Sequence, residues 1–171
     1  LCSDSGALMI YTSTDLVYDE CEDIKEDSSR LNPLTVYAAT KLLGEGSVKM
    51  NADRYIILRT ALVYGFTLSL YTSFFDIAYA KLKKGESLNA FTDQFRNPLY
   101  TEDAATILSE LPAKYQANDT INFCGNEYLS RYEMCLLMAK EFGFNKDLIL
   151  ESKSREFSQY KMVVRLGLNS D

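Results

Sequence analysis

The stretch from Ala7 to Lys41 constrains the fold of this chain most, because it joins a buried strand to a helix start. Its first part, ALMIYTSTD at residues 7–15, begins with apolar side chains and ends with polar ones. A short apolar run that stops at polar residues is typical of a buried strand. Ligands of open α/β sheets gather at the carboxyl ends of strands. The sequence therefore predicts that Ser13, Thr14 and Asp15 face a ligand site.

The second part of the stretch predicts a helix over residues 33–50. Asn32 is a favourable N-cap, and Pro33 suits the first helical turn. Tyr37 and Lys41 are four residues apart, so they share one face of this helix. The sequence therefore places a phenol and an ammonium side by side, shortly after the strand-end hydroxyls.

This pairing has a chemical use. A phenol has a pKa near ~10, and a nearby ammonium favours the phenolate and lowers that pKa. Tyr37 is then suited to act as a general acid. A hydroxyl such as that of Thr14, if it faces Tyr37, holds a carbonyl oxygen as negative charge develops on it. These residues predict a carbonyl-reducing or alcohol-oxidising site that needs a hydride carrier.

The same spacing also occurs at Tyr79 and Lys83, within a long amphipathic stretch. No strand-end hydroxyls precede that pair, so we interpret it as an ordinary helix surface. The same alternative exists for Tyr37 and Lys41, namely an exposed tyrosine beside a solvated lysine. The strand-end hydroxyls and the helix start upstream favour the functional interpretation for this pair.

Charge and composition exclude several classes of function. The net charge is −6 and no basic cluster occurs, which argues against binding to nucleic acid or to an anionic membrane surface. The chain has no His, and its four Cys form no Cys-x-x-Cys pair, so neither a zinc site nor a Ser-His or Cys-His nucleophile is expected, and no residue is assigned to a metal. The acidic segment 19–27 is interpreted as a solvated loop rather than a cation site. Free thiols and the lack of a ~20-residue apolar run predict a soluble, cytoplasmic protein.

Four sequence blocks extend over much of the chain. They are STDLVYD at residues 13–19, PLTVYAATKLLGE at 33–45, LRTALVYG at 58–65 and DQFRNP at 93–98. In this order and approximate spacing they resemble the dTDP-4-dehydrorhamnose reductases, which are extended short-chain dehydrogenases/reductases. The resemblance implies an α/β fold: the C-terminal part of a doubly wound, Rossmann-type parallel sheet with a smaller α+β substrate-binding lobe.

The resemblance also implies a reaction, in which NADPH or NADH reduces the 4-keto group of a nucleotide-linked deoxysugar, dTDP-4-dehydro-L-rhamnose. The implied catalytic residues are Tyr37, which protonates the carbonyl oxygen, Thr14, which holds it, and Lys41, which binds the nicotinamide ribose. A guanidinium suits a diphosphate, which makes Arg96 a candidate, although a loop arginine is more often solvated. The implied cofactor contacts are Ser13, Tyr37, Lys41, Thr60 and Ala61, and the implied substrate contacts are Thr14, Asp15, Tyr64 and Arg96.

A dinucleotide-binding domain normally begins with a Gly-rich turn between a strand and a helix. None of the eight glycines forms such a motif. We therefore expect this chain to be the second part of a reductase whose cofactor-binding half is missing from it. Residues 1–66 are expected to close the NAD(P)-binding Rossmann domain and to carry the catalytic residues, and residues 67–171 to form mainly the substrate-binding lobe.

Other segments predict further elements. Helix 33–50 contains Gly44 and Gly46, where either another backbone approaches closely or the helix tolerates the glycines. Ser130 opens a capping box for a helix to about residue 142, with Met134, Leu137, Met138 and Phe142 as its expected buried side. The remaining predicted elements are strands at 55–60, 87–91 and 120–123, a helix at 70–84 and an N-cap at Thr101.

Two other functions remain open at this level. A sugar-nucleotide epimerase or dehydratase shares the Tyr and Lys but holds its NAD tightly and regenerates it. A non-catalytic binding protein of the same fold, like the regulatory subunit of methionine adenosyltransferase, uses neither residue for catalysis. A free-standing domain with neither role is a third reading. The sequence also leaves open whether the protein forms a homodimer.

Overall fold

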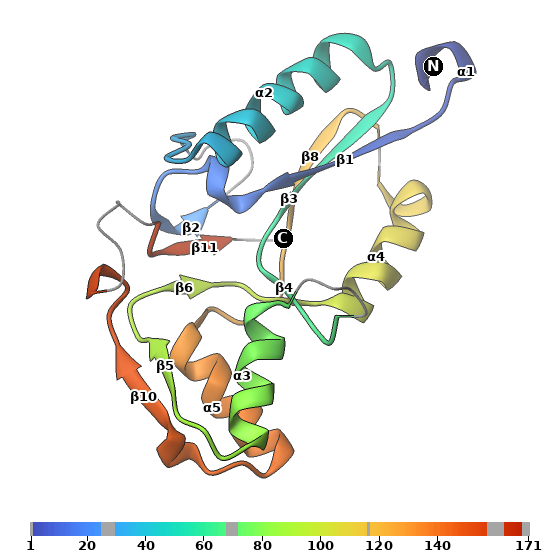
Figure 1. The fold of residues 1–171 in the computed structure, drawn as a ribbon. Coiled ribbons are helices and arrows are strands. Elements are labelled where there is room, and N and C mark those ends of the chain that lie inside the picture. The colour runs from blue at the N-terminus through green and yellow to red at the C-terminus, as the bar shows by residue number, and fades with distance from the viewer. Residues whose placement is uncertain (1, 25–29, 68–71, 116, 157–162, 169–171) are drawn as a thin grey trace.

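The computed structural model describes residues 2–24, 30–67, 72–115, 117–156 and 163–168. Its centre is a three-stranded parallel sheet in the order β1-β3-β8 (Figure 1). The strands are β1 (Met9–Thr14), β3 (Tyr55–Thr60) and β8 (Asp119–Phe123). Thr14 lies beside Thr60, and Thr60 lies beside Phe123, so all three strands end at one edge. The predicted strand-end hydroxyls therefore lie at the carboxyl edge of a parallel sheet.

Helix α2 (Val36–Asn51) connects β1 to β3. It begins three residues later than predicted, because Thr35 is the N-cap and its hydroxyl accepts a hydrogen bond from the Ala38 N–H at 3.1 Å. The predicted cap at Asn32 is wrong, since its side-chain amide donates to Asp19 instead. A β-carbon at Gly44 would overlap the Tyr11 hydroxyl, whereas one at Gly46 would meet open space.

Helix α4 (Thr101–Lys114) leads into β8 and covers the opposite face of the sheet from α2 (Figure 1). Alternate residues of a strand point to opposite faces. On β3, Ile56 and Leu58 accordingly pack with Leu111 of α4, whereas the next residue, Arg59, points to the other face and contacts α2. Tyr100 occupies the N-cap position of α4 without a side-chain bond, so the cap predicted at Thr101 is wrong by one residue.

The placement of α4 and β8 bears on the expected division of the chain, in which residues 67–171 form mainly, but not only, the substrate-binding lobe. Both elements follow residue 66, and β8 pairs with β3 and completes the sheet. The physical reason is the free edge of β3, which β8 satisfies with ladder hydrogen bonds. The second part of the chain thus contributes to both the sheet and the lobe.

The smaller lobe lies below the sheet in Figure 1 and has its own core. Its helices are α3 (Phe74–Lys83) and α5 (Arg131–Phe142), and its strands β5 (Leu88–Phe91) and β10 (Ile149–Ser152) pair in parallel. Capping boxes begin both helices, at Ser73 with Asp76 and at Ser130 with Glu133. The start predicted for α3 at residue 70 lies outside the described residues.

The buried side of α5 was predicted only in part. Met138 is buried, but Leu137 is 47% and Phe142 41% exposed. Cys135 and Ala139 are buried in their place, because the strands β5 and β10 meet the helix on that side. Leu137 lies one position from the buried residues, which a 3.6-residue period does not separate sharply, whereas Phe142 shares their face but is the last residue of the helix.

Short elements complete the fold. Strands β4 and β7 pair in parallel, β2 and β11 pair in parallel, and β6 and β9 pair antiparallel. Within the described residues no helix is long and apolar enough to cross a membrane. The short elements are α1 (Cys2–Ser5), η1 (Asp15–Val17), β2 (Cys21–Ile24), β4 (Val63–Tyr64), β6 (Phe95–Arg96), β7 (Leu99–Tyr100), β9 (Leu129–Ser130), η2 (Lys146–Leu148), η3 (Ser154–Glu156) and β11 (Leu166–Leu168).

Candidate active site

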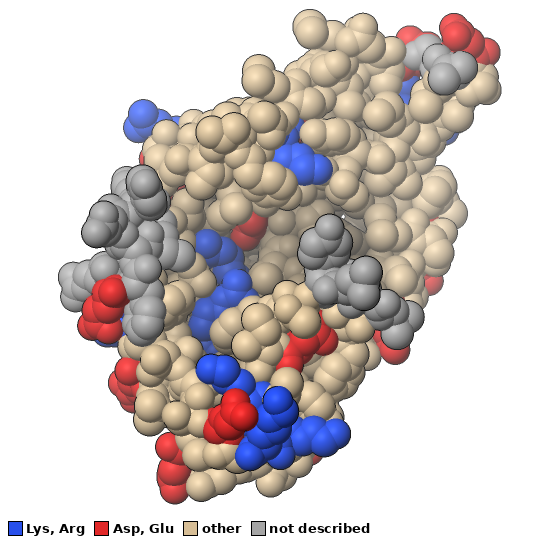
Figure 2. Space-filling view, in the orientation of Figure 1, with Lys and Arg blue, Asp and Glu red and all other residues tan. Residues whose placement is uncertain are grey.

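A cleft of about 950 Å³ lies at the carboxyl edge of the sheet, where the starts of α2, α4 and α5 and strand β6 meet it. Figure 2 shows the hollow at the middle of this face, with basic side chains gathered beside it. The cleft brings together all the predicted site residues except Tyr64. They are Ser13, Thr14, Asp15, Tyr37, Lys41, Thr60, Ala61 and Arg96.

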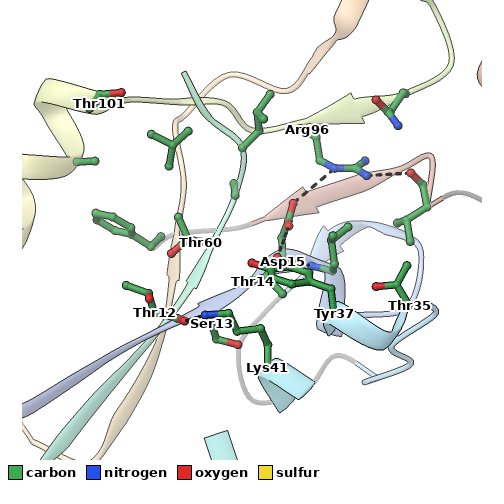
Figure 3. A pocket seen from close by; sticks show the side chains of 18 of the residues that line it. Thr12, Ser13, Thr14, Asp15, Thr35, Tyr37, Lys41, Thr60, Arg96 and Thr101 are labelled. Carbon is green, nitrogen blue, oxygen red and sulfur yellow. Dashed lines mark hydrogen bonds and ion pairs between the residues drawn. The ribbon is translucent and has the colours of Figure 1, made fainter. Parts of the chain in front are cut away.

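Tyr37 and Lys41 lie on the first turns of α2 and face the cleft (Figure 3). The Lys41 ammonium donates to the Thr12 carbonyl at 2.8 Å and lies 6.0 Å from the centre of the Tyr37 ring. Tyr11 holds the same turn, because its hydroxyl donates to the Lys41 carbonyl at 3.3 Å. Tyr37 is 53% exposed. The ammonium is thus anchored beside a phenol that water can reach.

Thr14 is buried at the end of β1, and its hydroxyl donates to Asp15 Oδ1 at 3.2 Å. Asp15 Oδ2 lies 3.5 Å from Arg96 Nε. Burial raises the pKa of Asp15, and the Arg96 charge opposes this change. Burial likewise lowers the pKa of Arg96, which Asp15 counteracts. For both partners the loss of hydration therefore outweighs the attraction across this long contact.

Arg96 is 7% exposed, and backbone carbonyls accept most of its donors. Nη1 donates to Phe95 at 2.6 Å and to Val164 at 3.2 Å, and Nη2 donates to Val163 at 2.8 Å. Figure 3 shows the guanidinium bridging Asp15 and the segment beside β11. Arg96 therefore connects the end of β1 to the C-terminal part of the chain, and its charge is already matched by Asp15.

Ser13 lines the cleft but points its hydroxyl away from a ligand. It donates to Glu45 Oε1 at 2.5 Å, and Glu45 is paired with Arg59 through Nη2 at 2.7 Å. Arg59 also donates to the Tyr18 hydroxyl at 2.9 Å, which in turn donates to Asn122 at 2.9 Å. This buried network joins all three strands of the sheet to α2. Sequence reasoning assigned no role to Glu45 or Arg59, although Glu45 lies one helical turn after Lys41.

Tyr64 is not brought to the cleft. It lines a separate hollow of about 540 Å³, and its ring lies 5.6 Å from those of Phe75 and Tyr100. Tyr79 and Lys83, the second pair with the same spacing, also lie apart from the cleft. Tyr79 packs in the lobe against Phe66 and aromatic rings near the end of α5.

Sequence reasoning also missed Gln94 and Arg131, which line the cleft from the lobe side. Arg131 Nε donates to Gln94 Oε1 at 3.2 Å, and its backbone N–H donates to the Gln94 carbonyl. Gln94 belongs to the sequence block at residues 93–98 that carries the family resemblance. Arg131 belongs to none of the four blocks, and the sequence marks it only as the residue after the Ser130 N-cap. Its two hydrogen bonds to Gln94, just before β6, make it part of the cleft.

The parallel sheet, the strand-end hydroxyls and the helical Tyr37–Lys41 pair define a Rossmann-type α/β protein of the short-chain dehydrogenase/reductase class. A family model described as "RmlD substrate binding domain" matches residues 1–161. The chain therefore belongs to the RmlD substrate-binding-domain family, and it has the fold of sugar-nucleotide reductases and epimerases.

Three relatives illustrate the match. Methionine adenosyltransferase 2 subunit beta of Xenopus tropicalis is 33% identical over 81% of this chain and 43% of that protein. A dTDP-4-dehydrorhamnose reductase from Bacillus anthracis, solved with NADP, superposes with a TM-score of 0.85 at 22% identity, over 99% of this chain and 59% of that one. A dTDP-4-dehydrorhamnose reductase ortholog from Clostridium acetobutylicum has a TM-score of 0.82 at 25% identity, with the same coverage. The chain thus spans less than half the length of the curated relative.

Proposed function

We propose that this chain carries the catalytic and substrate-binding part of an NAD(P)H-dependent reductase of a nucleotide-linked 4-keto sugar, of the dTDP-4-dehydro-L-rhamnose type. One observation carries the proposal: Thr14, Tyr37 and the anchored ammonium of Lys41 line one cleft at the carboxyl edge of the sheet. This arrangement supplies a proton donor and a hydroxyl for a carbonyl oxygen, together with a cation beside the donor.

The residues of the cleft are compatible with a nicotinamide cofactor. Among the described residues the Lys41 ammonium donates only to the Thr12 carbonyl, so further N–H donors are left for ribose hydroxyls. Thr60 and Ala61 present small side chains at the end of β3. Tyr37, Lys41, Thr60 and Ala61 would hold the cofactor, which supplies the hydride when bound. Ser13 does not fit this role, because its hydroxyl is bound to Glu45.

The proton is handled by the chain itself. As the carbonyl carbon gains a hydride, its oxygen gains negative charge, and Tyr37 donates the phenolic proton to it. Thr14 would hold the same oxygen, which requires its hydroxyl to turn from Asp15 towards the substrate. The Lys41 charge stabilises the phenolate that remains. Since Tyr37 is half-exposed, water restores its proton after the alcohol leaves.

The test is Tyr37→Phe in the complete gene product that contains residues 1–171. We expect turnover, measured as NADPH oxidation with dTDP-4-dehydro-L-rhamnose, to fall by about 10²-fold or more, with nearly unchanged substrate affinity. Tyr79→Phe is the matched control, because it removes a phenol of the same Tyr-x-x-x-Lys spacing outside the cleft and should keep full activity. Equal activity of Tyr37→Phe and the parent would refute the proposal.

The curated relatives support a second candidate, a non-catalytic regulatory subunit. The 33% identity to a methionine adenosyltransferase subunit extends over most of this chain. In that case the complete protein would bind a methionine adenosyltransferase catalytic subunit in a pull-down and would oxidise no NADPH with any keto sugar. An epimerase or dehydratase would instead retain NAD through purification and show no net NADPH consumption.

A further inference from the structure

Two buried arginines near the cleft each have a carboxylate partner and acceptors for at least three of their side-chain N–H donors within the protein. Arg59 is 3% exposed and is paired with Glu45 through two of its nitrogens. Arg96 is paired with Asp15 and donates to three backbone carbonyls. Both guanidinium groups therefore already have a counter-ion and most of their acceptors within the protein. This includes Arg96, which the sequence had suggested for a diphosphate.

Arg131 differs from both. It is only partly exposed, and the described residues accept a single one of its five side-chain N–H donors, at Gln94. The atom Nη1 is buried without an acceptor among the described residues. One face of the guanidinium lies 4.7 Å from the centre of the Phe74 ring. The guanidinium is thus held by the hydrogen bond at Nε and by the Phe74 ring on one face. Its Nη1 and Nη2 donors have no acceptor among the described residues.

The charge of Arg131 is also unmatched. Within the described part of the chain no carboxylate lies within ion-pair distance of it, and the nearby Asp15 is already shared with Arg96. Burial and the positive charge of Arg96 together lower the pKa of Arg131 to about 10, and the opposing effects of Cys135 and Asp15 do not offset them. A partly buried cation with spare donors next to a second cation is stabilised by an anion with several acceptor oxygens.

We propose that Arg131 is the residue of this cleft that binds the diphosphate of the ligand; the inference rests on the proposed function for the identity of that ligand. Arg131 and Gln94 belong to the lobe side of the cleft, whereas Tyr37 and Lys41 belong to α2. A nucleotide sugar lying across the cleft would present its sugar to Tyr37 and its diphosphate to Arg131. Arg96 has a positioning role, because its contacts with Asp15 and with backbone carbonyls hold the end of β1 against the segment beside β11.

The test compares Arg131→Met and Arg131→Lys with the parent in the complete gene product. Met keeps the apolar stem over Phe74 and leaves the Ser130–Glu133 capping box intact. Binding of dTDP and of dTDP-L-rhamnose is measured by calorimetry, and stabilisation by inorganic pyrophosphate is measured by thermal shift. Arg54→Met is the matched control, because Arg54 is exposed and donates only to the Gly6 carbonyl among the described residues.

We expect Arg131→Met to weaken dTDP and dTDP-L-rhamnose binding by at least tenfold each, to abolish the pyrophosphate effect and to leave NADPH affinity unchanged. Arg131→Lys should keep more affinity than Arg131→Met but less than the parent, since the ammonium keeps the positive charge and loses the bidentate donor geometry of the guanidinium. Affinities within twofold of the parent, or a pyrophosphate shift equal in both proteins, would overturn the inference. So would a parent that binds neither dTDP nor pyrophosphate. A parent that binds pyrophosphate through Arg131 but no sugar nucleotide would leave this anion site standing and refute the proposed function instead.

Discussion

Replacing Glu45 by Gln tests the buried network that holds the catalytic helix on the sheet. Glu45 is 2% exposed and accepts from Arg59 Nε at 3.1 Å, from Arg59 Nη2 at 2.7 Å and from Ser13 at 2.5 Å. Gln has nearly the same shape, but it carries no charge and turns an NH₂ group towards one of these donors. The substitution therefore leaves the Arg59 cation buried without its counter-ion.

The expected loss follows from these contacts. A hydrogen bond to a charged group contributes roughly 1.5–3 kcal/mol, and removing one partner of a buried ion pair costs about 3–5 kcal/mol. We expect Glu45→Gln to lower the free energy of unfolding by about 3–5 kcal/mol. For a chain of 171 residues this corresponds to a fall in Tm of roughly 6–20 °C.

The assay is urea and thermal unfolding followed by circular dichroism. Glu110→Gln is the matched control, because it breaks the Glu110–Lys114 pair, in which both side chains are exposed. Exposed pairs contribute little to stability, so the control midpoint should not move. If Glu45→Gln unfolds at the same urea concentration as Glu110→Gln, the buried pair does not stabilise the fold, and the reasoning fails.

Two further outcomes are expected from the structure. Gly125→Ala should destabilise the chain by about 1–3 kcal/mol in urea unfolding, because the new β-carbon overlaps the Pro98 carbonyl. Gly46→Ala should instead stabilise it by about 0.5–1 kcal/mol, because its β-carbon meets open space on a helix. Equal effects of the two substitutions would contradict this reasoning. Hydrogen bonds from Ser73 and Thr67 lower the pKa of Asp76 to about 2. The stabilising effect of the Asp76 carboxylate should therefore be full above pH ~4 and disappear as the pH falls towards 2. The difference in unfolding free energy between the parent and Asp76→Asn should shrink over that interval. A difference independent of pH would contradict a stabilising role for the charged carboxylate.

Local patterns in the sequence were sufficient for most elements of the fold. The strand at Tyr55–Thr60 and the capping box at Ser130 occur as predicted, because each depends on residues close together in the chain. The start of α2 was misplaced, because Thr35 competes with Asn32 for the cap, and Asn32 is instead bound to Asp19, which lies outside the local helix-start pattern. Likewise, the return of β8 to the sheet depends on the free edge of β3 and has no local signal.

The candidate site divides in the same way. The sequence by itself determined the class of chemistry, because a strand-end hydroxyl and a Tyr-x-x-x-Lys helix lie within one continuous stretch and the chain order brings them together. The tertiary structure alone decided which charges remain available to a ligand. It pairs Ser13 with Glu45 and Arg96 with Asp15, and it turns Tyr64 away. It also places Arg131, from a helix more than ninety residues after Tyr37, at the edge of the same cleft, where the described residues accept only one of its side-chain donors. Hydrogen-bond satisfaction is a property of neighbours in space, and no spacing along the chain encodes it.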